Sequence, residues 1–372
     1  MCKTHLNSVK YFFRNNNYSA AKWALSLILI LLSTKCTTVI NVPLYEYPTD
    51  WKDELVRYKT INDYSNYLSG KKIFLDPGHG GEDRKNTNRS GTVVEADVNL
   101  NVALYLKYYL QKAGAEVFLS RAIDEAVPLK LRSELANASG SDLFISIHHN
   151  APSKIEDDYT NYTSTYYHAK ETDYEYEPCE RDVARYIQRD LSYVMRNSGG
   201  LGSFDGTYSD YNIYPGEGFS VLRNTNIPAV LVECSFHTSR WEELRLNNIT
   251  FNQIQAWGIF RGIAKYFRAG IPSIQFISDS TKFDDNTYQL TFSLADSSGI
   301  NPKSISVYVN KQEVKFDFDG MTGFLKITIG NISEAENIIR IICANKNGNH
   351  SLPFHKKIKM DDNANIILEK IN

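Results

Sequence analysis

The sequence lacks the charge excess of a nucleic-acid-binding protein. Its 372 residues carry 41 Lys and Arg against 43 Asp and Glu, a formal net charge of −2. Without a basic excess the chain cannot neutralise a run of phosphates, so a nucleic-acid partner is not expected. The composition is 42% hydrophobic and 23% charged. These values are typical of a globular protein, and the length allows two domains with separate cores.

Cysteine is also scarce. The chain has five cysteines, of which Cys2 and Cys36 stand near the N-terminus. Removal of an N-terminal leader would leave Cys179, Cys234 and Cys343, an odd number without the spacing of a disulfide framework. We therefore predict no essential disulfide.

The most apolar run, "WALSLILILLS" at 23–33, is too short to span a bilayer comfortably. Basic residues precede it, as in a secretion signal, so we predict a leader at 1–36 and an exported protein of the cell envelope or periplasm. Cys36 follows "LLSTK", which resembles a lipoprotein processing site, although Lys35 replaces the usual small residue. Lipidation at Cys36, ordinary cleavage and an uncleaved membrane anchor all stay open.

Strands and helices alternate from residue 72. The apolar runs at 72–76, 115–120, 142–150 and 228–236 predict strands, and the patterns at 97–114, 128–140, 181–199 and 253–267 predict helices. Nearly continuous apolar strands separated by helices indicate an α/β fold whose sheet is covered on both faces.

After residue 268 the sequence pattern changes from alternating strands and helices to short strands alone. Short alternating segments such as "YQLTFSLAD" and "FLKITIG" predict a C-terminal β-sandwich of immunoglobulin-like type at 269–372. The predicted organisation is a leader at 1–36, a linker at 37–70, a catalytic domain at 71–268 and this sandwich. The last domain offers no functional motif.

Four polar residues stand at or beyond the ends of predicted strands, or beside the first helix. They are His79, Glu95, His148 and Glu233. In an α/β sheet the catalytic and ligand-binding residues lie at the carboxyl ends of the strands. Two imidazoles and one carboxylate form a known zinc set for hydrolysis, and a further carboxylate that is not a ligand can move protons.

Each of these residues also has a purely structural explanation. His79 can be a turn residue, and Glu95 can stabilise a helix N-terminus. Successive strand residues point to opposite faces, so at most one of His148 and His149 can face the site. Glu233 is hardest to explain structurally, because a carboxylate that closes a buried strand needs a partner.

Several segments in order resemble the zinc-dependent N-acetylmuramoyl-L-alanine amidase family, the bacterial cell-wall amidases of Amidase_3 type. They are "IFLDPGHGG", Glu95 with "DVNL", "EVFLSRAIDEAVPLKLRSELAN", "DLFISIHHNA", "FSVLRNTNIPAVLVE" and "GIFRGIAKYF". The resemblance covers about residues 71–268. It implies a phosphorylase/hydrolase-like amidase fold, a twisted mixed sheet flanked by helices.

The resemblance also implies a chemistry. His79, Glu95 and His148 match the ligands of one zinc ion per catalytic domain, and Glu233 matches the catalytic acid/base. The implied reaction is hydrolysis of the amide between N-acetylmuramic acid and L-alanine in peptidoglycan, for wall remodelling or daughter-cell separation. Asn150 and Arg132 are second-rank candidates for substrate binding. For Arg132 a salt-bridged structural role is the alternative.

The sequence departs from the family pattern at several places, among them "TVV" at 92–94 and the residues Cys234 to His237 after Glu233. Two longer polar segments also depart from it. "EDRKNTNRS" at 82–90 is unusually charged and polar, and 153–180 is long and rich in Tyr, Asp and Glu. We expect both to lie near the substrate, and a lid or the contact of a regulatory protein partner fits best in 153–215. His168 and His237 are read as structural or surface residues unless they lie near the metal.

Two other functions compete with the amidase. A zinc peptidase acting on the stem peptide would use the same chemistry, and a non-catalytic wall-binding or scaffold protein would use the β-sandwich. The intact set of His79, Glu95, His148 and Glu233 argues against the scaffold, because binding alone has no use for a carboxylate beside an open metal position.

Overall fold

The computed structural model of the protein describes residues 46–154, 156–199, 205–277, 282–284, 287–330, 337–360 and 366–371. The predicted leader and Cys36 lie outside these residues. Within the described ranges, no helix combines the length and apolar character needed to cross a membrane.

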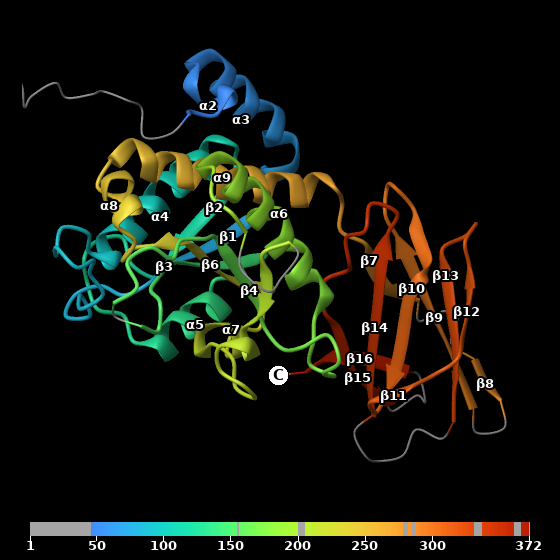
Figure 1. Ribbon diagram of the computed structural model, residues 1–372. Coiled ribbons are helices and arrows are strands. Elements are labelled where there is room, and N and C mark those ends of the chain that lie inside the picture. The colour runs from blue at the N-terminus through green and yellow to red at the C-terminus, as the bar shows by residue number, and fades with distance from the viewer. Residues whose placement is uncertain are drawn as a thin grey trace, which may run out of the picture. The chain divides into compact units, whose positions relative to one another are not determined.

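A six-stranded mixed sheet forms the centre of the first part of the chain (Figure 1). Its strands run in the order β2-β1-β3-β6-β4-β5. The first four are parallel, whereas β4 is antiparallel to β6 and parallel to β5. The bounds are β1 Lys72–Pro77, β2 Glu116–Leu119, β3 Leu143–Asn150, β4 Ser164–Tyr167, β5 Thr207–Ser209 and β6 Ala229–Phe236. The predicted mixed α/β sheet is confirmed.

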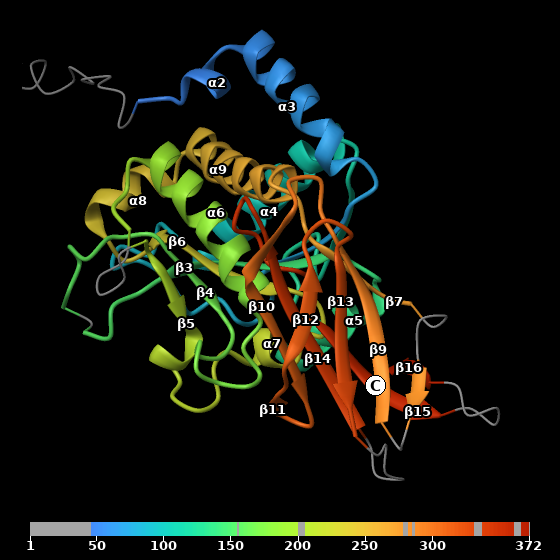
Figure 2. The same ribbon diagram turned by 90° about the vertical axis from the view of Figure 1, so that its right-hand side faces the viewer.

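Helices cover both faces of this sheet, as Figure 2 shows from the side. In β1 the side chains alternate, so Ile73 and Leu75 pack under α4, α6 and α9 while Phe74 packs on the opposite face with α5 and α7. The helices are α2 Thr49–Lys52, α3 Glu54–Leu68, α4 Glu95–Lys112, α5 Leu129–Ala138, α6 Pro178–Met195, η2 Asp210–Asn212, α7 Ser220–Arg223, α8 Arg240–Leu246 and α9 Ile249–Arg268.

The segment predicted as a linker at 37–70 differs from that prediction over its described part. It contains α2 and α3, and its buried residues Trp51, Ile61 and Leu68 join the same core as α9. In α3 only Ile61, Tyr64 and Leu68 are buried, in a helix that is otherwise polar. This apolar stripe is too thin to stand out in the sequence.

The C-terminal part contains two antiparallel five-stranded sheets. One has the order β11-β10-β14-β15-β16, and the other has β12-β13-β9-β7 with β8 paired to β9. Side chains from both sheets, including Leu290, Phe292 and Ile341, share one hydrophobic core. The strands are β7 Ser273–Phe276, β8 Lys282–Asp284, β9 Thr287–Ala295, β10 Ile300–Val309, β11 Gln312–Glu313, β12 Phe316–Asp319, β13 Phe324–Ile329, β14 Asn337–Asn345, β15 Phe354–Met360 and β16 Ile366–Lys370. A domain boundary at 268 stays a prediction, since residues 45–372 form one compact unit.

Candidate metal centre

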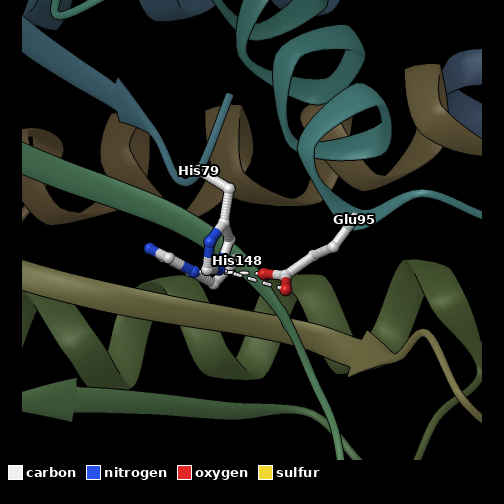
Figure 3. Close-up of side chains that lie close together, drawn as sticks. All are labelled: His79, Glu95 and His148. Carbon is white, nitrogen blue, oxygen red and sulfur yellow. Dashed lines mark hydrogen bonds and ion pairs between the residues drawn. The ribbon is translucent and has the colours of Figure 1, made fainter. Parts of the chain in front are cut away.

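Three of the four sequence-predicted residues meet at the carboxyl edge of the sheet. His79 lies in the turn after β1, His148 lies on β3, and Glu95 is the first residue of α4 (Figure 3). One carboxylate oxygen of Glu95 is 3.2 Å from His79 Nε2, and the other is 3.1 Å from His148 Nδ1. One ligand atom from each residue lies within 4.8 Å of the others. These residues could hold a single metal ion.

The turn after β1 is rich in glycine because its backbone is crowded. His79, Gly80 and Gly81 all have positive φ, at 59°, 121° and 60°. A Cβ on Gly80 would lie 2.5 Å from the Glu125 carbonyl oxygen, and a Cβ on Gly78 would lie 2.1 Å from the His148 ring. Glycine is therefore needed for the backbone to pass this close to the site.

Two residues that the sequence did not single out, Asp83 and Asn86, orient His79 and Glu95. Asp83 lies 2.7 Å from His79 Nδ1, which leaves Nε2 facing Glu95. The Asn86 amide donates to Glu95 at 2.9 Å and lies 3.1 Å from His79 Nε2. A carboxylate on the outer nitrogen of a histidine is a common support for a metal ligand, because it fixes the tautomer and the ring orientation.

The electrostatics of the cluster favour a bound cation. Burial alone would raise the pKa of Glu95, but its hydrogen bonds to His148 and His79 hold that pKa well below the usual range. Burial also works to lower the pKa of His79, and the hydrogen bonds to Glu95 and Asp83 outweigh it, raising the pKa to about 9. A buried carboxylate anion between two imidazoles is a donor set that suits zinc.

The neighbouring histidine, His149, also lines the cavity of these residues, but its ring bonds to other side chains and is not among the three donors. Its Nδ1 is 2.8 Å from the Asn99 amide oxygen, and the Gln255 amide is 2.9 Å from its Nε2. Burial lowers its pKa to about 3, so the ring is neutral. Of the two adjacent histidines, only His148 belongs to the group of possible metal donors.

Glu233 lies on β6 directly across from His148 on β3. It lines the same cavity as His79 and Glu95. Burial raises its pKa well above the usual range, and the Glu95 carboxylate adds to this effect. Its Oε2 atom is buried and has no hydrogen-bond partner among the described residues. A buried carboxylate oxygen without a partner is costly unless a ligand or a reacting group completes it.

Arg132 lines the same cavity, but protein groups occupy its guanidinium. It is 4% exposed, and its guanidinium donates to the Asp76 carboxylate at 2.6 Å and to the carbonyls of Pro77, His79 and Val127 at 2.9 Å each. This geometry favours a role in positioning the His79 turn over contact with substrate.

The cavity around the three predicted ligands, called here the larger cavity, has a volume of about 830 Å³. Asn150 lines it, with a side-chain oxygen that accepts from the Ala151 amide at 2.7 Å. His237 also lines it, 3.9 Å from Glu95, so this histidine belongs to the site after all. His168 pairs with Asp210 at 2.9 Å and does not line the cavity.

The fold and the site together define a class, an α/β protein with a histidine–carboxylate metal centre and a further carboxylate beside it. A family model described as N-acetylmuramoyl-L-alanine amidase matches residues 73–265. The chain belongs to the N-acetylmuramoyl-L-alanine amidase family, enzymes named for the amide bond that they hydrolyse in peptidoglycan.

Two curated relatives agree with this assignment. The germination-specific N-acetylmuramoyl-L-alanine amidase of Bacillus subtilis (strain 168) is 32% identical over 214 residues, which cover 54% of this chain and 81% of that protein. N-acetylmuramoyl-L-alanine amidase LytC of the same strain is 31% identical over 217 residues, which cover 57% of this chain and 39% of LytC. The solved structure of an N-acetylmuramoyl-L-alanine amidase from Clostridium difficile 630 shares 30% identity over 54% of this chain and 98% of that chain, with a TM-score of 0.46.

Proposed function

We propose that the protein is a zinc-dependent amidase of the cell envelope that cleaves the amide between N-acetylmuramic acid and L-alanine. His79, Glu95 and His148 would hold the zinc ion. The observation that carries this proposal is the meeting of these three donors beside Glu233, whose buried Oε2 has no hydrogen-bond partner within the described part of the chain.

Zinc bound by these residues would supply Lewis-acid polarisation of the amide carbonyl. Glu233 is placed to take a proton from the attacking water and to pass it to the nitrogen of the departing L-alanine. Burial and the Glu95 carboxylate raise its pKa, and a raised pKa is a common feature of carboxyl groups that act as general acid and base. Arg132 would hold the His79 turn in place through the carbonyl of that residue.

The export signal predicted at 1–36 and the peptidoglycan substrate place the proposed action outside the cytoplasmic membrane, with Cys36 as a candidate lipid anchor. A solved structure at 28% identity shows the CwlD amidase of Clostridioides difficile in complex with the GerS lipoprotein. We propose by analogy that a protein partner regulates this enzyme. For residues 269–372 we propose a β-sandwich domain of immunoglobulin-like type.

The test is digestion of purified peptidoglycan sacculi with identification of the newly exposed amino groups. We expect N-terminal alanine to appear, and we expect Glu233→Gln to lower its rate of appearance by about 10²-fold or more while metal binding is kept. Glu134→Gln, which removes an exposed carboxylate on α5, is the matched control and should behave as the parent.

Two outcomes would contradict the proposal. Release of a different N-terminal residue would identify a stem-peptide peptidase instead. A Glu233→Gln variant that works at the parent rate would remove this carboxylate from the mechanism.

A further inference from the structure

A second cavity of about 410 Å³ adjoins the metal centre. Asn86, Ala151 and His237 line both cavities. Asn86 contacts His79 and Glu95 directly, so the second cavity begins at the residues that surround the proposed zinc. A substrate held at the metal can therefore extend into it.

The second cavity lies between the two polar segments, 82–90 and 153–180, that depart from the family pattern. Lys85 and Arg89 come from the polar segment that follows β1, and Lys154 comes from the segment that follows β3. All three side chains are exposed at the cavity wall. In the ranges that the structure describes, neither Lys85 nor Arg89 forms an ion pair, so their charges are available to a ligand.

Two of the carboxylates in the same wall are already engaged. Asp158 is buried and bonds to Arg240 at 2.6 Å. Asp157 accepts from the Thr160 hydroxyl at 2.5 Å and from the backbone amides of Tyr159 and Thr160, and these hydrogen bonds lower its pKa. Asp157 and the exposed Glu156 keep their charges, and within the described residues only Asp158 is neutralised by a cation, Arg240. Against them stand Lys85, Arg89 and Lys154, so the wall keeps a small positive excess.

The larger cavity has a different character. Its buried cation, Arg132, is bonded to Asp76. Its exposed cation, Arg223, donates to the Glu217 carbonyl at 2.5 Å and lies 3.9 Å from the Glu217 carboxylate. Apolar side chains such as Leu129 and Phe219 complete the wall. These features suit an uncharged sugar chain better than an acidic peptide.

We propose that the second cavity binds the acidic stem peptide, with Lys85 and Arg89 facing the free carboxylate of the glutamate that follows L-alanine. This proposal rests on the amidase function proposed above. Two residues of extended chain reach about 7 Å from the scissile nitrogen, and Asn86, which follows Lys85 in the chain, is itself 3.1 Å from His79 Nε2. Lys85 and Arg89 are thus specificity-determining residues for the peptide side of the substrate.

The test uses product-like dipeptides as inhibitors of sacculus digestion. L-alanyl-γ-D-glutamate carries the free carboxylate, and L-alanyl-D-isoglutamine differs from it only in having an amide at that position. We expect the acid to inhibit the parent about three- to ten-fold more strongly than the amide, a difference appropriate to two exposed charge pairs. High salt should shrink this difference.

In the double variant, with Lys85→Gln and Arg89→Gln, both dipeptides should inhibit sacculus digestion equally. Lys59→Gln removes an exposed lysine of α3 that lines neither cavity, and it should keep the parent preference. Melting temperatures of all variants should match the parent, because these side chains are exposed.

The failures of the two proposals are distinguishable. If the parent does not release N-terminal alanine from sacculi, the proposed function fails. If it does, but the two dipeptides inhibit equally or not at all, the peptide subsite is refuted. If Arg223→Gln removes the preference and the double variant keeps it, the peptide lies in the larger cavity and the proposal is overturned.

Discussion

The substitution Gly78→Ala tests whether the site depends on the close passage of the β1 turn past His148. A Cβ at residue 78 would lie 2.1, 2.3 and 2.6 Å from three atoms of the His148 ring. Ordinary contact begins near 3.4 Å, so the ring must move by about 1.3 Å. Metal–ligand distances tolerate only about 0.2 Å, so this shift takes the imidazole out of coordination range.

We therefore expect Gly78→Ala to weaken zinc binding by about 10–100-fold or more. This is the range found when the residues that orient a metal ligand are mutated. Turnover at saturating zinc should fall by about 10²-fold, as expected for a misplacement near 1 Å. Competition with a chromogenic chelator measures the first quantity, and sacculus digestion measures the second.

Gly320→Ala is the matched control, since its nearest neighbour is Phe318 at 3.9 Å. It should keep the parent affinity for zinc. Parent-like zinc affinity and turnover in Gly78→Ala would refute the view that His148 is a ligand held against this turn.

Two further substitutions test the frame around the site. Arg132→Ala leaves the buried Asp76 carboxylate without its cation, so we expect a loss of about 3–5 kcal/mol in the free energy of unfolding, measured by denaturant titration; a loss below about 1 kcal/mol would contradict this. Burial raises the pKa of Glu180 to about 8, above its unfolded value of 4.5. The folded state therefore binds the extra proton between these pH values, and stability is lost as the pH rises through this window. Glu180→Gln should remove this loss. The free energy of unfolding of the variant minus that of the parent should therefore rise by about 1.4 kcal/mol per pH unit from pH 4.5 to 8. A difference that stays constant over this range would show that Glu180 does not titrate there.

Much of the sheet and the metal site was predictable from the sequence because the signals are local. The apolar run of β1 ends at the turn that carries His79. The apolar runs of β3 and β6 likewise lead to His148 and Glu233, which lie two and three residues before the strands end. Parallel strands bring their carboxyl ends to one edge, so residues far apart in sequence were expected to meet.

The supporting residues could not be found in this way. Asp83 and Asn86 lie in a polar loop whose path is fixed by contacts with His79 and Glu95, and no periodic pattern marks such a path. His237 follows the end of β6 and is held at the site by two contacts with β3. Its backbone amide donates to the Asn150 carbonyl, and its Nδ1 lies 2.8 Å from the His149 carbonyl oxygen. The Asp83 carboxylate, four residues after His79, was the one local signal available.

The central claim is that His79, Glu95 and His148 coordinate one zinc ion. Metal analysis of the purified protein tests it most directly. The parent should contain one zinc ion per chain, and Glu95→Gln, which keeps the shape of the side chain and removes its charge, should lose most of that zinc while staying folded by circular dichroism. Full zinc occupancy in a folded Glu95→Gln protein, or a catalytically active parent without bound metal, would contradict the account.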